Sequence, residues 1–201
     1  MKNKTIAIIG AFVLVLTGLT GCAGSTSAAD PAGPSAAESE EVAGMANPWV
    51  EITEEEAKQL CTRLFKAPDG AKTRVWQKCE SLGDPAQNIG PLVQLDFELD
   101  GMDFTARAQA GAAEDADISG MFVEWSEGPD DVTLANWGEG NMAGKTYRAV
   151  DDMGYYDLIT WYDVEIGIKY SLSVSAPDLD GFDIQAVAEQ MYDPANEPPV
   201  E

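Results

Sequence analysis

Apolar and polar residues alternate along much of the chain after residue 90, and this alternation predicts β-strands. Between residues 92 and 99, every second side chain from Val93 onward is apolar. Residues 102–110 alternate in the same way, and the intervening Asp100-Gly101 is typical of a two-residue type I′ turn. The pattern therefore predicts a β-hairpin with one buried face and one solvated face.

The same alternation recurs in other short stretches of the chain. Glycine-rich residues 132–145 predict a loop, and residues 128–131 (Gly-Pro-Asp-Asp) are expected to interrupt the strand before them. Further strands are expected at residues 73–79, 121–126, 146–150, 156–162 and 166–174, the last two as a second hairpin. The chain is thus expected to form about six or seven antiparallel strands.

Two segments have helical periodicity instead. Residues 54–66 predict a helix, because Thr53 and Glu56 form a capping box and the apolar side chains follow a helical spacing: Ala57, Leu60, Cys61, Leu64 and Phe65. A second helix carries Ile184, Val187, Ala188 and Met191, with Asp180 or Asp183 as its N-cap. The expected fold is α+β: an antiparallel sheet with an N-terminal and a C-terminal helix packed on it.

The start of the chain has a different pattern. Lys2 and Lys4 precede an apolar run from residue 6 to residue 16, which is too short to span a bilayer and fits a secretory signal. The run is followed by Leu19-Thr20-Gly21-Cys22, which resembles the lipobox of bacterial lipoproteins. This resemblance implies a signal peptide over residues 1–21, cleavage between Gly21 and Cys22, and lipid attachment at the Cys22 sulfur.

A lipid at Cys22 would hold the mature protein on the extracytoplasmic face of the cell membrane, because each buried CH₂ contributes about 0.8 kcal/mol. Residues 22–47 are mostly small or polar, so we expect a lipidated N-terminus followed by a disordered tether of about 25–30 Å. Residues 48–195 are expected to form a single globular domain, and residues 196–201 a disordered tail.

Charge and composition narrow the classes of function. The chain has 12 Lys and Arg residues against 35 Asp and Glu, a net charge of −23, which opposes binding to nucleic acid and to anionic lipid surfaces. The absence of histidine excludes a Ser-His-Asp triad and any histidine-based metal site. We therefore predict no catalytic residues, no metal site and no cofactor.

The remaining cysteines, Cys61 and Cys79, leave two interpretations open. An exported domain permits a disulfide between them. Cys61 also lies on the apolar face of the expected first helix, where a buried free thiol is equally ordinary.

Carboxylates and aromatic residues supply the other candidate chemistry. Paired acids could serve a glycosidase-type hydrolase, but the candidates alternate outward on strands and a solvated face is expected for them: Asp96, Glu98, Asp103 and Glu124. Ile159 and Trp161 lie on the face opposite Tyr156 and Tyr162, where they form either core or an exposed patch.

The end of the chain carries a further resemblance. Trp161-Tyr162, Gly167-Ile168, Tyr170-Ser171-Leu172 and the segment from Gly181 to Glu189 resemble the ending of uncharacterised extracytoplasmic domains of Gram-positive lipoproteins and anti-sigma-type membrane proteins. This resemblance implies a sheet-plus-helix fold and no known catalytic residues. We expect a non-enzymatic binding or sensing module for an envelope protein or small ligand; the alternative is a carboxylate-based hydrolase acting at the cell envelope.

Overall fold

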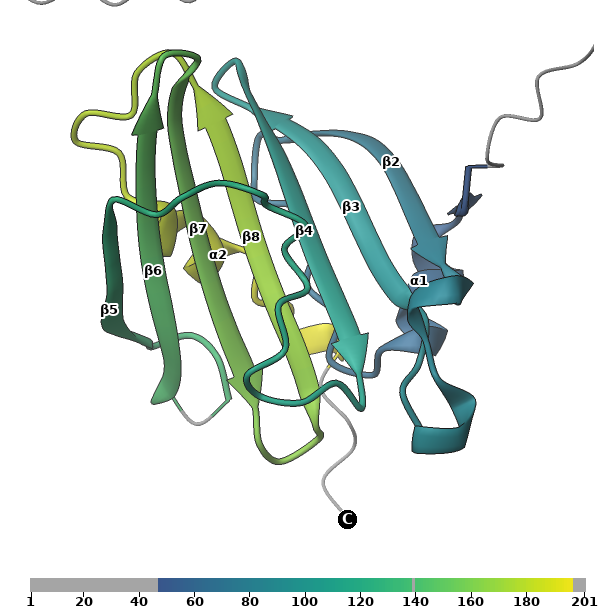
Figure 1. Cartoon of the computed structure of the whole chain (residues 1–201). Coiled ribbons are helices and arrows are strands. Elements are labelled where there is room, and N and C mark those ends of the chain that lie inside the picture. Colours follow the sequence, from purple (N-terminus) through teal and green to yellow (C-terminus); the bar gives the residue numbers. More distant parts are fainter. Residues whose placement is uncertain (1–46, 139, 197–201) are drawn as a thin grey trace, which may run out of the picture. The chain divides into compact units, whose positions relative to one another are not determined.

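The computed structural model describes residues 47–138 and 140–196 (Figure 1). All of their strands belong to one antiparallel sheet. Its eight strands are β1 (Trp49–Ile52), β2 (Lys72–Cys79), β3 (Leu92–Leu99), β4 (Met102–Ala110), β5 (Glu127–Leu134), β6 (Met142–Asp151), β7 (Gly154–Asp163) and β8 (Ile168–Ala176). Among these residues there are two α-helices, α1 (Glu54–Leu60) and α2 (Ile184–Gln190), and three short 3-10 helices, η1 (Glu80–Leu82), η2 (Pro85–Gln87) and η3 (Pro194–Asn196). The fold is a mostly-β α+β fold.

The strand count and the N-terminal helix differ from the sequence prediction. Eight strands form instead of six or seven, and a strand, β1, precedes the first helix. The four residues of β1 are too few to show an alternation of their own, and they are held by pairing with β2, from Trp49 opposite Cys79 to Ile52 opposite Trp76.

The sheet consists of two four-stranded meanders joined at its centre. The strand order is β1-β2-β3-β4-β8-β7-β6-β5, so the last strand of each meander pairs with the last strand of the other. Residues 111–126, called the crossover below, carry the chain from the end of β4 to the outer strand β5 across one face of the sheet (Figure 1). This connection covers a face that would otherwise be open to solvent.

Both helices pack on the face opposite the crossover. The buried core there includes Phe65 below α1, Phe97 and Phe104 of the first meander, and Val187 and Met191 of the C-terminal segment. Phe97 and Phe104 stack with their ring centroids 5.0 Å apart. Because this core draws on both meanders, it joins them across the β4–β8 boundary.

Ile159 and Trp161 belong to this core. Their exposed fractions are 0% and 1%, and the Trp161 ring stacks on Tyr170 at 5.2 Å. The alternative interpretation of these two residues as an exposed aromatic patch is therefore wrong. The helices cover the face on which they lie, and the opposite face carries the side chains of Tyr147, Thr160 and Tyr162 that line a pocket.

The predicted hairpin and both helix starts are confirmed. β3 and β4 pair from Val93 opposite Ala108 to Leu99 opposite Met102, and Asp100 and Gly101 both have positive φ, 52° and 79°, as a type I′ turn requires. The Thr53–Glu56 capping box is present at α1. Asp183, one of the two expected N-caps of α2, accepts a hydrogen bond from the Ala186 amide.

Two predicted elements have different bounds. The first helix ends at Leu60 instead of residue 66, because Cys61 adopts an extended backbone, although Leu64 and Phe65 are still buried. Residues 121–126 form no strand; they belong to the crossover, and the strand begins at Glu127 instead. Residues 128–131 lie within β5, since an edge strand tolerates a proline that a central strand would reject.

The predicted signal peptide, the Gly21–Cys22 cleavage site and nearly all of the predicted tether and tail lie outside the described residues. At their borders, the Asn47 side chain accepts a hydrogen bond from the Trp49 amide at 3.1 Å. The Asn196 side chain donates to the Leu64 carbonyl at 2.9 Å. Within the described part of the chain, no helix is both long and apolar enough to cross a bilayer.

Candidate functional site

A pocket of about 740 Å³ lies between the crossover and the sheet face that carries no helix. Its floor comes from side chains of β6, β7 and β8, and its walls from the crossover and β5. The volume is in the range of small-molecule sites. The side chains that matter most are Trp125, Tyr147 and Tyr162, the two lysines Lys145 and Lys169, and the acids Glu114, Asp115, Asp117 and Asp131.

Two cations on adjacent strands, the buried Lys169 and the half-buried Arg107, hold the crossover over the sheet. Lys169 of β8 donates to the Glu114 carbonyl oxygen at 2.7 Å. Arg107 of β4 donates to the Ile118 carbonyl oxygen at 3.1 Å and to the Gln94 side chain at 2.8 Å. The crossover wall is thus fixed by its main chain, which leaves the side chains of Glu114 and its neighbours available to the pocket.

The Arg107 guanidinium contacts both the crossover and the first meander. It lies 5.3 Å from the centroid of the Trp49 ring, a cation–π contact, and burial lowers its pKa, opposed by the nearby charges of Asp96 and Asp117. Next to it, Cys79, Leu92 and Ile118 form a small second hydrophobic cluster on the same face. This cluster anchors the middle of the crossover.

Lys169 is 7% exposed, an unusual burial for a lysine. Loss of hydration lowers the pKa of its ammonium group, and the carboxylates of Glu114, Asp117 and Asp115 act in the opposite direction. The acidic segment of the crossover therefore compensates a cation that would otherwise be costly to bury.

An aromatic corner forms one side of the pocket. Trp125 of the crossover and Tyr147 of β6 lie with ring centroids 5.5 Å apart and planes tilted by 44°. Both rings, and that of Tyr162, are half-buried, so part of each remains open to the pocket. Half-buried aromatic rings in a pocket provide contact area for a ligand at little cost in conformational entropy.

Some charged side chains of the pocket have partners within the protein and others do not. Lys145 pairs with Asp131 at 3.4 Å, and Asp117 accepts hydrogen bonds from the amide and hydroxyl of Ser119. The carboxylates of Glu114 and Asp115 make no hydrogen bond or ion pair within residues 47–138 and 140–196. The lining holds four carboxylates against two ammonium groups, which gives an excess of negative charge.

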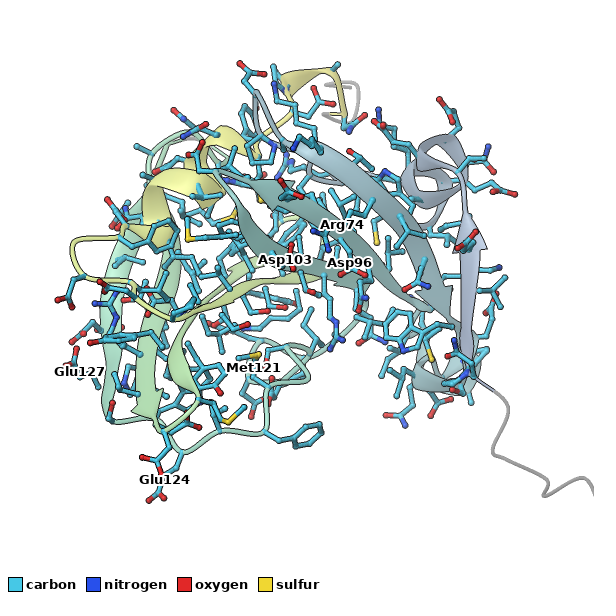
Figure 2. All side chains as sticks on the ribbon, turned by 90° about the horizontal axis from the view of Figure 1, so that it is seen from above. Arg74, Asp96, Asp103, Met121, Glu124 and Glu127 are labelled. Atoms are coloured by element: carbon cyan, nitrogen blue, oxygen red, sulfur yellow. The ribbon has the colours of Figure 1, made fainter. Side chains whose placement is uncertain are left out.

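The acids that the sequence singled out lie elsewhere. In the view of Figure 2, Asp96 and Asp103 lie near Arg74 at the centre, and Glu124 lies at the lower left edge. Asp96 accepts from Thr105 at 2.8 Å, and Asp103 pairs with Arg74 at 2.6 Å. Glu98 pairs with Lys72 and Arg74, which lower its pKa. Three of the four candidate acids are thus engaged in structural contacts, and the fourth, Glu124, is exposed and lines neither pocket.

The two cysteines lie on opposite faces of the sheet and are both free and buried. Cys61 packs in the core under α1, where burial raises the pKa of its thiol to about 12. Cys79 packs in the second cluster beneath the crossover. Of the two open interpretations, the structure contains the pair of free thiols, because the sheet separates Cys61 from Cys79.

Other charged groups serve the fold. Arg148 of β6 forms a two-pronged pair with Asp157 of β7, at 2.7 and 2.6 Å, beside a smaller pocket of about 250 Å³. Arg63 pairs with the buried Asp163 on the helical face. Among the described residues, no group of three or more acids or cysteines is arranged to hold a metal ion.

Comparison of the chain with protein-family models, with curated proteins and with solved structures gives no match. The pocket is therefore interpreted from its own geometry and chemistry.

Proposed function

We propose that this protein is a lipid-anchored extracytoplasmic module that binds a small ligand in the pocket beneath the crossover, without catalysing a reaction. The pocket is the main support for this proposal, because it combines a suitable volume, half-buried aromatic rings such as Trp125 and Tyr147, and a wall held by the buried Lys169. The Leu19-to-Cys22 sequence supports the anchor.

The acids that the sequence singled out as candidates for hydrolysis are not placed for it. Glycoside hydrolysis by two carboxylates needs them to face each other across a substrate, about 5–9.5 Å apart. Asp96, Glu98 and Asp103 are instead held by hydrogen-bond donors or cations, and they line neither pocket.

The anchor is tested by mass spectrometry of the protein from its native membrane. We expect a mature N-terminus at Cys22 that carries a diacylglyceryl group, and we expect a Cys22→Ala variant to lack the lipid and to stay uncleaved. Wild-type protein that starts at another residue, or that carries no lipid, would contradict this part of the proposal.

The binding part is tested by ligand-observed NMR of the full lipoprotein in dodecyl maltoside micelles, using a panel of neutral, cationic and anionic aromatic fragments. We expect some fragments to bind the wild type and to lose binding in Trp125→Ala, which removes one ring of the aromatic corner. Phe122→Ala is the control, since Phe122 is a fully exposed aromatic residue of the same crossover that does not line the pocket. A panel with no Trp125-dependent binder would contradict the proposal.

A further inference from the structure

We infer that the pocket selects a ligand that carries a protonated amine or quaternary ammonium group, placed against Trp125 and Tyr147 and facing the carboxylates of Glu114 and Asp115. This inference rests on the proposed function and adds the chemical class of the ligand. It concerns the charge of the ligand, which the volume of the pocket does not determine.

The two lysines of the pocket are engaged within the protein. The Lys169 ammonium is directed to the Glu114 carbonyl oxygen at 2.7 Å and is almost completely buried. Lys145 lies 3.4 Å from the Asp131 carboxylate. Lys169 is thus not available to an anionic group, while Lys145 and Asp131 are exposed and offset each other's charge.

Two carboxylates remain without a hydrogen bond or ion pair, and together with Asp117 they offset the single buried charge of Lys169 from a distance. Glu114 and Asp115 are exposed on the crossover wall and have no partner for their side chains among the described residues. The surrounding protein adds to their potential, since the chain has a net charge of −23. An anionic ligand would be repelled both by the wall and by the molecule as a whole.

The aromatic corner favours the same sign of charge. The faces of Trp and Tyr rings attract cations placed within about 6 Å of the ring centroid, and sites for quaternary ammonium groups use such rings in pairs or cages. Trp125 and Tyr147 meet at 5.5 Å with a tilt of 44°, so the rings contact each other, and a cation on the open side of this corner can lie within 6 Å of both centroids. The rings and the carboxylates therefore act on the ligand in the same direction.

The inference is tested with three probes of matched size: phenylethylammonium, 2-phenylethanol and 3-phenylpropionate. Each is titrated by calorimetry into the full lipoprotein in dodecyl maltoside micelles. We expect the dissociation constant of the cation to be at least tenfold lower than that of the anion, with the neutral probe between them. Added salt at about 0.5 M should narrow the difference, because it screens the carboxylates of an open pocket.

Variants locate the effect in the pocket. Glu114→Gln with Asp115→Asn should reduce the preference for the cation at least fivefold, while the main-chain bond to Lys169 is preserved. Glu98→Gln with Asp103→Asn is the matched control: it removes the same charge from the other half of the sheet and should leave the preference unchanged. An equal loss in both double variants would overturn a local carboxylate effect.

The outcomes separate this inference from the proposed function. If the neutral or anionic probe binds more tightly and its binding depends on Trp125, the ligand class is wrong while the pocket remains a binding site. If none of the three probes shows Trp125-dependent binding, both the ligand class and the binding function are contradicted.

Discussion

At the scale of single residues, the buried lysine Lys169 gives the fold a distinctive dependence on pH. Burial lowers its pKa below the ordinary 10.5, so the folded protein releases this proton at a lower pH than the unfolded chain does. Between the lowered pKa and pH 10.5, the unfolded state binds more protons than the folded state. Lys169 therefore makes the free energy of unfolding increase with pH in this window. Below that window both states are charged, and the burial cost is present in full.

We therefore predict that Lys169→Met removes a rise in stability on the alkaline side. The measurement is urea unfolding of the wild type and the variant from pH 7 to pH 10.5. Only the difference between the two curves is informative, because other groups also titrate in this range. The prediction fails if the two proteins show the same slope, which would mean that Lys169 keeps its ordinary pKa in the folded state.

At the scale of elements, the crossover depends on a glycine beside Arg107. Gly120 has a φ of +65°, and a Cβ at this position would lie 2.1 Å from a guanidinium nitrogen that holds the Ile118 carbonyl. We predict that Gly120→Ala displaces Arg107 and, through the loss of its charged hydrogen bond to Ile118, destabilises the protein by about 1.5–3 kcal/mol beyond the backbone strain.

Gly70→Ala is the matched control for this prediction. Gly70 has a φ of +84°, but nothing lies within 4 Å of the position of its Cβ, so that variant reports the backbone strain alone. Both variants are measured by urea unfolding at neutral pH. Equal destabilisation of the two would show that the contact with Arg107 contributes nothing to the crossover.

Elements with a strong pattern were predictable, and those fixed by partners were not. The β3–β4 hairpin follows from alternation and a two-residue turn, and the capping box at Thr53 follows from local hydrogen bonding. β5 was missed because its eight residues contain only Val132 and Leu134 as large apolar side chains, and its proline indicates a break. This segment is a strand because it pairs with β6, and the local sequence pattern does not contain that pairing.

The pocket was unpredictable for a related reason. Trp125 and Lys169 come from segments 44 positions apart, brought together by the route of the crossover and by the order of β6, β7 and β8. Aromatic residues in the second half of the sequence indicated a cluster, but not which rings would be buried. Which rings are buried depends on which face of the sheet the helices cover. The two-residue alternation separates the two faces but does not show which one is covered.

At the scale of the whole molecule, the shared core predicts a single unfolding transition. Phe104 of β4 is 2% exposed and contacts Phe97 of its own meander and Phe182 before α2. We predict that Phe104→Ala lowers stability by about 3–5 kcal/mol while both meanders still unfold together. Far-UV and near-UV circular dichroism should give coincident transitions; separate transitions for the two signals would show that the meanders are independent.

The position of β8 at the centre of the sheet has a consequence for synthesis, which proceeds from the N-terminus. The first meander can assemble as soon as β4 has emerged, but the free side of β4 waits for β8, whose register places Arg107 opposite Ser171. Until some sixty further residues have emerged, β4 has one unpaired edge, and this edge later lies at the centre of the sheet. This interval is the period of greatest risk for mispairing with another chain, and any premature stop before β8 would leave that edge permanently exposed.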